Sequence, residues 1–174
     1  RPSTTPSSGR NTPPLWGVAS TAPYHWDGAL ADLPAFSTRM VNQMGGSGLS
    51  RTDVSDLSSY LTIISLPDNP ALGRLAPGLV SRGEDLFKER CAGCHAGEAL
   101  TDGLGHVAAG SGELKKLDTP SLKGVFATAP YLHDGSAPTL RAILTGAWVS
   151  VSEHDQRRLS SADLDALEAF VSSR

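Results

Sequence analysis

The pentapeptide CAGCH at residues 91–95 constrains this chain more than any other feature. It holds both cysteines of the 174-residue sequence, and His95 follows Cys94 directly. This spacing is the attachment pattern of c-type haem, in which two thiols add to vinyl groups and the adjacent imidazole binds the iron. A redox dithiol is one alternative, and a zinc site of Cys91, Cys94 and two distant histidines is another. The pattern favours one covalent haem c, with His95 as the proximal iron ligand.

Composition narrows the class of protein further. The formal net charge of −3 argues against a nucleic-acid partner, which normally binds a basic surface. Apolar runs such as residues 61–66 are far shorter than the roughly 20 residues that span a bilayer. With 18 glycines, 12 prolines and 6% aromatic residues, we expect many turns and a thin core that a haem would fill.

The attachment motif also predicts the compartment. Covalent haem attachment takes place outside the bacterial cytoplasm or in organelles, so we expect a periplasmic or other extracytoplasmic location. The sequence begins with Arg1 and shows no charged and apolar leader. We therefore expect that any signal peptide was removed or lies upstream.

An internal repeat divides the chain. Residues 12–28 read TPPLWGVASTAPYHWDG and residues 119–135 read TPSLKGVFATAPYLHDG, at an offset of 119 − 12 = 107. Further on, Leu49 and Ser50 correspond to Leu159 and Ser160, at an offset of 159 − 49 = 110. We predict a tandem duplication: a partial first repeat at 1–66 that lacks CxxCH, a linker at 67–79, and a complete cytochrome c domain at 80–174.

Three helices are predicted from caps and apolar spacing. Ser81-x-x-Glu84 is typical of a capping box and predicts a helix over residues 82–90. Ser160-x-x-Asp163 and Ser50-x-x-Asp53 predict two more helices. Their apolar faces would be Leu164, Leu167, Phe170 and Val171 in one helix, and Val54, Leu57, Tyr60, Leu61 and Ile64 in the other.

Strand signals are weak, and the glycine-rich run 103–112 is predicted to be a loop. The expected fold is therefore all-α and loop-rich. It resembles class I cytochromes c, in which the first and last helices cross beside the haem. Gly83 and Phe87 facing Phe170 would suit such a crossing.

The second axial position on the iron decides whether the haem can bind small molecules. His154 lies 160 − 154 = 6 residues before the closing helix, where class I cytochromes place the distal ligand. We therefore predict His154 as sixth ligand and His106 as the alternative, with a loop role for His106 otherwise. Met44, also six residues before its helix, or Met40 would serve a missing first haem. His133 is expected to be structural, because its counterpart in the repeat is Trp26.

The repeated element TPxLxGVxxTAPYxxDG also needs a role. Its prolines predict an extended segment, and Asp134-Gly135 predicts a tight turn. Such a segment can wrap a haem with apolar side chains while polar groups meet propionates or buried carbonyls. Leu122 and Tyr131 are accordingly predicted to contact the cofactor.

Together, CAGCH, LTDGLGH at residues 100–106 and LDTPSLKGVFATAPYLHDGSAPTL at residues 117–140 resemble the bacterial di-haem cytochrome c peroxidase and MauG-type family. The resemblance implies two c-type haem domains, one for electron transfer and one that reacts with peroxide. This sequence departs from it by lacking an N-terminal CxxCH. It also lacks a methionine where peroxidases commonly place the electron-transfer ligand, so bis-histidine ligation and a low potential are expected.

The expected function is one-electron transfer through a six-coordinate, low-spin haem, within a larger redox complex. The alternative is the C-terminal electron-transfer part of a di-haem peroxidase or MauG-type oxidase whose reactive haem lies upstream or on another chain. A third possibility is a subunit that mainly supports a complex. A redox partner protein is expected to dock on the incomplete first repeat, over an apolar face that includes Trp16, Trp26, Phe36 and Leu57.

Overall fold

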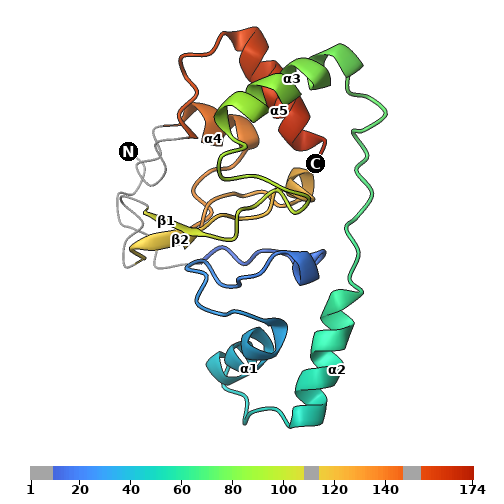
Figure 1. The fold of residues 1–174 in the computed structure, drawn as a ribbon, viewed down its shortest axis with the longest axis vertical. Coiled ribbons are helices and arrows are strands. Elements are labelled where there is room, and N and C mark those ends of the chain that lie inside the picture. Colours follow the sequence, from blue (N-terminus) through green and yellow to red (C-terminus); the bar gives the residue numbers. More distant parts are fainter. Residues whose placement is uncertain (1–9, 108–113, 147–153) are drawn as a thin grey trace.

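Two groups of helices stand at opposite ends of the molecule, with loops between them (Figure 1). The computed structural model describes residues 10–107, 114–146 and 154–174. One end holds α1 (Leu33–Gln43) and α2 (Arg51–Thr62). The other holds α3 (Pro77–Arg90), α4 (Leu140–Thr145) and α5 (Ser161–Ser172). The 3₁₀ turns η1 (Val18–Ser20) and η2 (Val125–Ala127) and the strands β1 (Gly105–Val107) and β2 (Lys116–Asp118) complete the described elements.

Two of the three predicted helix starts are confirmed. The Ser50 hydroxyl accepts a hydrogen bond from the Asp53 amide at 3.1 Å, and the Asp53 carboxylate accepts one from the Ser50 amide at 3.0 Å. The Ser160 hydroxyl likewise accepts from the Asp163 amide at 3.1 Å. These contacts satisfy amide groups that the first turn of a helix leaves without partners.

The predicted start of α3 is wrong. The helix begins at Pro77 rather than Arg82, within the expected 67–79 linker, and its N-cap residue Ala76 makes no side-chain cap. Proline is suited to the first helical position because its φ is already helical and its missing N–H has no partner there. Ser81 and Glu84 therefore lie inside the helix, where Glu84 pairs with Lys88 at 2.7 Å.

The crossing of the first and last helices of the second half is confirmed. A Cβ atom built at Gly83 of α3 would lie 1.9 Å from the carbonyl oxygen of Ala166 in α5. The rings of Phe87 and Phe170 pack beside this point, with centroids 5.0 Å apart. Glycine is required because the two backbones approach too closely for any side chain.

We expect Gly83→Ala to lower the free energy of unfolding by about 1–3 kcal/mol, as overpacking of a core does. The matched control is Gly78→Ala in the same helix, because a Cβ there meets nothing within 4 Å. The control should be neutral or stabilising by up to about 1 kcal/mol, since alanine favours helix over glycine. Urea unfolding of the holoprotein measures both values. Equal effects at the two positions would contradict the close crossing.

The fold is mostly helical but contains a small sheet that the sequence did not predict. β1 and β2 are antiparallel, with His106 opposite Leu117. Residues 105–107 are therefore a strand rather than part of the predicted glycine-rich loop, and residues 108–112 of that run lie outside the described residues. Three residues are too few to show the alternation by which strands are recognised in a sequence.

The two copies of the repeated segment have the same local conformation. Each has a left-handed glycine before its 3₁₀ turn, a cis X-Pro peptide bond and an isolated β-bridge. In each, the tyrosine hydroxyl donates to the carbonyl of the valine that opens the turn. Tyr24 reaches Val18 at 3.1 Å, and Tyr131 reaches Val125 at 2.9 Å.

These segments meet through a reciprocal pair of backbone hydrogen bonds. The Asn11 amide donates to the His133 carbonyl at 2.8 Å, and the Asp118 amide donates to the Trp26 carbonyl at 2.9 Å. The positions correspond at one offset, because 118 − 11 = 107 and 133 − 26 = 107. The rings of Trp26 and His133 also touch edge to face, with centroids 6.4 Å apart. Each copy therefore contributes the same two positions to the junction.

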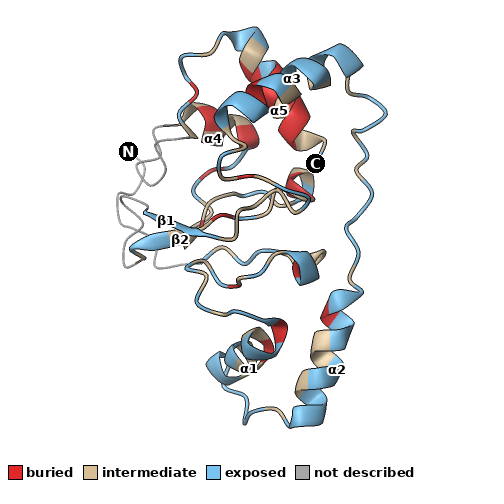
Figure 2. Cartoon of the chain, in the orientation of Figure 1, coloured by how far each residue is buried: buried red, intermediate tan, exposed pale blue. Residues whose placement is uncertain are grey.

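The core of the second half is larger than that of the first. Buried residues of α3, α4, α5 and η2 form one cluster, whereas the first half gathers Val18, Tyr24, Leu33 and Leu61. Figure 2 shows this contrast between the helices at the two ends. The described helices include none that is long and apolar enough to cross a membrane.

The apolar face predicted for the first half differs from the one observed. The predicted residues Trp16, Trp26, Phe36 and Leu57 are half-buried within the chain. Phe36 and Leu57 pack on the core of the first half itself, whereas Trp16 and Trp26 lie against Gly124 and His133 of the second half. The large apolar side chains of this half that are exposed are Leu15, Met44, Tyr60, Ile63 and Leu66.

Candidate haem site

The attachment residues follow directly from the last turn of α3. The Cys91 amide donates to the Phe87 carbonyl at 2.8 Å, and the His95 amide donates to the Cys91 carbonyl at 2.9 Å. These bonds continue the helical turn through the motif. Cys91 and Cys94 form no disulfide and are half-buried, while His95 is buried. The backbone therefore brings both thiols and the imidazole to one end of the α3 and α5 crossing.

The His95 ring is held in one orientation. Its Nδ1 atom lies 3.1 Å from the carbonyl oxygen of Leu100, and since a carbonyl can only accept, Nδ1 carries the proton. This leaves Nε2 with a lone pair for a metal ion, the arrangement that metal-binding histidines commonly have. Burial lowers the pKa of His95, which favours the neutral ring that a ligand needs.

The structure places His154 beside His95. The two ring centroids are 6.3 Å apart, and the ring planes are inclined by 21°. Two imidazoles that bind one ion from opposite sides have centroids about 6 Å apart, since each metal–nitrogen bond is about 2 Å. The spacing therefore fits an iron atom between the two rings.

The alternative ligand His106 also lies near the attachment motif, with a ring nitrogen within 4.8 Å of the Cys94 sulfur, but its ring is engaged by another residue. His106 is on β1, half-exposed, and its Nε2 atom pairs with the Asp102 carboxylate at 2.7 Å. Met44 follows α1 and is 87% exposed, and Met40 is half-buried on the same helix. The structure thus brings His154, and not the predicted alternative His106, against the His95 ring.

The structure also bears on the two alternatives to haem. Burial raises the pKa of the Cys91 thiol to about 11. A redox dithiol needs the opposite, an exposed thiol with a lowered pKa. Cys94, Asp102 and His106 bring ligand atoms within 4.8 Å of one another, a group that differs from the predicted zinc site of Cys91, Cys94 and two histidines. A thioether bond at Cys94 would remove the thiolate from that group.

Leu122 and Tyr131 lie at the same core as the attachment motif. Both are half-buried against the cluster that also contacts Cys91 and Leu100. The Tyr131 hydroxyl is bonded to the Val125 carbonyl. The sequence suggested a haem propionate or a buried carbonyl as the partner of this hydroxyl. In the structure the partner is the carbonyl of the buried residue Val125.

Asp118 is a half-buried acid that sequence reasoning missed. Its Oδ1 atom is inaccessible to solvent and has no hydrogen-bond partner among the described residues. Burial, together with the charge of Asp102, raises the pKa of Asp118 to about 7. The repeat could have drawn attention to this acid, because the equivalent residue of the first copy is the neutral Asn11.

We expect Asp118→Asn to flatten the dependence of stability on pH. The folded-state pKa of about 7 lies above the ordinary aspartate value of 3.8, so between these pH values the folded protein holds the proton that the unfolded chain releases. Wild-type stability should therefore fall as pH rises from about 4 to 7, and the variant should be the more stable at pH 8. Urea midpoints at pH 5 and 8 measure this, with the exposed Asp68→Asn as control. A wild-type slope retained in Asp118→Asn would contradict it.

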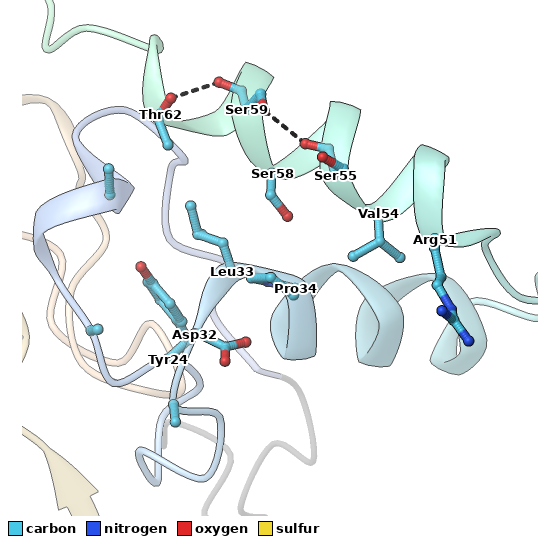
Figure 3. Close-up of a pocket in the computed structure, with 13 residues that line it drawn as sticks. Tyr24, Asp32, Leu33, Pro34, Arg51, Val54, Ser55, Ser58, Ser59 and Thr62 are labelled. Atoms are coloured by element: carbon cyan, nitrogen blue, oxygen red, sulfur yellow. Dashed lines mark hydrogen bonds between the residues drawn. The ribbon is translucent and has the colours of Figure 1, made fainter.

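An open groove of about 670 Å³ lies between α1 and α2, away from these residues (Figure 3). Its lining includes Pro34, Ser55 and Ser58. The corresponding positions in the second half are Arg141 (34 + 107), Asp165 (55 + 110) and Glu168 (58 + 110). There the Arg141 guanidinium pairs with Asp165, and with Glu168 at 2.7 Å. In the second half these ion pairs connect α4 to α5. The groove lies at the equivalent place in the first half, where Pro34, Ser55 and Ser58 cannot form them.

Comparison with known proteins agrees with a haem protein. Residues 118–148 match the family model described as RoxA-like, cytochrome c-like. No curated protein matches the chain. Hydrazine synthase of Kuenenia stuttgartiensis, pressurised with xenon, superposes with a TM-score of 0.80 and 19% identity, over 95% of this chain and 72% of that one. A MauG-like protein associated with microbial copper homeostasis superposes with a TM-score of 0.68 and 18% identity, over 97% and 73% of the two chains.

At these identities the superpositions establish the fold, and the family match covers only part of the second half. The expected resemblance to MauG-type proteins is confirmed at the level of the fold. A cytochrome c-like domain implies haem-based redox chemistry. The chain therefore has a cytochrome c-like fold, shared over nearly its whole length with a MauG-like protein and with hydrazine synthase.

Proposed function

We propose that the chain is a one-electron carrier with one haem c, attached through Cys91 and Cys94 and ligated by His95 and His154. The observation that carries this proposal is the 6.3 Å separation of the two histidine rings. When bound, the haem supplies a centre that accepts and releases a single electron. If His95 and His154 both held the iron, the chain would leave no place there for peroxide or oxygen.

The side chains around the site would hold the cofactor and keep the ligands in place. Cys91 and Cys94 anchor the ring, and the Leu100 carbonyl fixes the His95 tautomer. Leu122, Tyr131 and the cluster of α3 and α5 provide apolar contacts and exclude water. A buried, rigid site reduces the rearrangement that accompanies electron transfer, which suits a carrier.

Absorption spectroscopy of the holoprotein tests the proposal. We expect a low-spin spectrum that does not change when peroxide or carbon monoxide is added. Mass spectrometry should find one covalent haem per chain. A high-spin spectrum that responds to either molecule would instead favour a peroxide-reactive haem, and a colourless protein with two reactive thiols would overturn the haem altogether.

A second candidate function is supported by the fold shared with the MauG-like protein. In this reading the chain is the electron-transfer part of a di-haem peroxidase or MauG-type oxidase, and the reactive haem lies upstream or on another chain. The matching conformations of the repeated segments support a tandem duplication with a partial first repeat at 1–66. Met44 or Met40 would serve a haem there.

We further propose that the chain works outside the cytoplasm, because covalent haem attachment takes place there. We also propose that it belongs to a larger redox complex. A redox partner would dock on the first half, because this half has a small core and exposes several large apolar side chains. Pull-down of the holoprotein from a periplasmic extract, followed by reduction of the captured complex, tests whether electrons pass between the two. A partner that cannot reduce the haem would favour a purely supporting role.

A further inference from the structure

A carboxyl oxygen without a hydrogen-bond donor lies at the junction of the two halves. The Oδ1 atom of Asp118 is inaccessible to solvent, and no described residue donates to it. The Asp118 amide donates to the Trp26 carbonyl at 2.9 Å, and a Cβ atom built at Gly28 would lie 3.6 Å from Oδ1. The first-half turn therefore lies against this oxygen and brings no donor to it. Such surroundings disfavour the charged carboxylate, in agreement with the raised pKa of Asp118.

The acid belongs to the half that carries the attachment motif. The equivalent residue of the first copy is the neutral Asn11, whose side-chain amide donates to the Pro130 carbonyl at 2.6 Å. The two equivalent positions thus differ in charge and in how well they are satisfied. A symmetric structural role for both residues does not explain an acid at this position of the second half alone.

The segment that carries Asp118 is bonded to the loop that orients the His95 ring. The Thr119 carbonyl accepts from the Thr101 hydroxyl at 2.5 Å. Thr101 directly follows Leu100, whose carbonyl holds the Nδ1 atom of His95. A single hydrogen bond therefore joins the surroundings of this carboxyl to those of the proximal histidine.

Asp102 of the same loop links Asp118 electrostatically to the attachment motif. A carboxylate oxygen of Asp102 lies within 4.8 Å of the Cys94 sulfur, the atom that the haem would join. Burial raises the pKa of Asp118, and the charge of Asp102 raises it further. This region is partly buried, so water screens charges there less than at an exposed site. The other charged or titratable side chains on the surrounding elements are His106, paired with Asp102, Lys116 on the same strand, and Asp27, paired with His25 in the first-half turn.

We propose that Asp118 binds a proton when the haem is reduced and releases it when the haem is oxidised. This inference rests on the proposed carrier function. The electron comes from the redox partner and the proton from solvent, so one electron and one proton enter together and leave together. Reduction removes one positive charge from the iron and thereby weakens the attraction that favours ionised Asp118. The chain would therefore hold its electron more tightly at low pH than at high pH.

Potentiometric titration of the holoprotein from pH 5 to pH 9 tests this coupling. The equilibrium constant for reduction of the wild type should fall about tenfold as Asp118 ionises, which is about 59 mV for a one-electron couple. The midpoint of the fall should lie near pH 7. Asp118→Asn should keep, at every pH, the larger constant that the wild type has at pH 5, since the amide is uncharged like the protonated acid.

Asp134→Asn is the matched control, because Asp134 belongs to the same repeated segment. Burial opposes ionisation of Asp134, but hydrogen bonds from Ser136 bring its pKa below the ordinary value, so it stays charged from pH 5 to pH 9. The dependence of the potential on pH should be the same in this variant as in the wild type.

A second variant keeps the test informative if Asp118→Asn perturbs folding. Asp102→Asn removes the charge that helps to raise the pKa of Asp118, and asparagine can still accept from the Leu104 amide. The midpoint should therefore move to lower pH while the size of the change stays the same. An indicator dye in weakly buffered solution should also record proton uptake by the wild type on reduction near pH 7, and none by Asp118→Asn.

A wild-type potential that is independent of pH would overturn the proposal. So would a dependence that survives in Asp118→Asn, because a haem propionate or His106 would then be the titrating group. In both cases reversible one-electron reduction would leave the carrier function standing. A haem that cannot be reduced reversibly would overturn the carrier function as well, so the two failures are distinguishable.

Discussion

His154→Ala is expected to convert the haem from a low-spin, six-coordinate centre into a high-spin centre with one open position. The reason is that the His154 ring lies 6.3 Å from the His95 ring, whereas the His106 ring is paired with Asp102 and Met44 is 87% exposed. The variant should bind carbon monoxide stoichiometrically, whereas wild type should bind almost none. Absorption and electron paramagnetic resonance spectra of the ferric and ferrous proteins measure the change.

His106→Ala is the matched control for that experiment, because His106 was the alternative ligand and its ring is paired with Asp102 at the surface. It should retain the low-spin spectrum. If His154→Ala remains low-spin and His106→Ala does not, the ligand assignment must be exchanged. His154→Met should restore six-coordination and raise the reduction potential, since a thioether ligand favours ferrous iron.

The paired change Cys91→Ser and Cys94→Ser should abolish covalent haem attachment. The two thiols are the sole cysteines of the chain, and each thioether bond requires one of them. Mass spectrometry of the denatured chain should find essentially no haem adduct, against one per wild-type chain. The variant should also be less stable, because a haem that is lost would no longer pack against the apolar cluster of α3 and α5.

The single variants Cys91→Ser and Cys94→Ser serve as graded controls. Each should keep one covalent link, with a shift of the pyridine haemochrome band that reports the lost thioether. A double variant that still carries haem through denaturation would contradict attachment at this motif. A double variant that folds with wild-type stability would contradict a haem-filled core.

The attachment site was predictable because its chemistry is local. CAGCH places both thiols and the imidazole within one turn of chain, so no distant contact is needed to recognise it. The position of His154 six residues before its helix was equally readable, and the structure brings its ring to His95. Its role as ligand remains a proposal.

Features that depend on distant contacts were not predictable. The start of α3 was misplaced because Ser81 and Glu84 have the form of a capping box, whereas Pro77 supplies the start without any side-chain cap. The helix α4 and the short β1–β2 pair are too short to show a period, whereas the start of α1 at the Asp32 cap and Pro34 was readable and was missed. The pKa of Asp118 depends on burial between the halves, which the chain sequence alone does not reveal.

The junction of the two repeated segments has a consequence for how the molecule tolerates being cut. The halves are joined by residues 10–30 and 114–137 through Asn11, Trp26, Asp118 and His133. The stretch between α2 and α3 adds contacts of its own, since the Ile64 carbonyl accepts from the Gly17 amide at 2.9 Å and the Asn69 side chain donates to the Ser172 carbonyl at 2.7 Å. Because the main junction lies outside this stretch, a nick at its exposed residues 72–74 should leave the two parts associated.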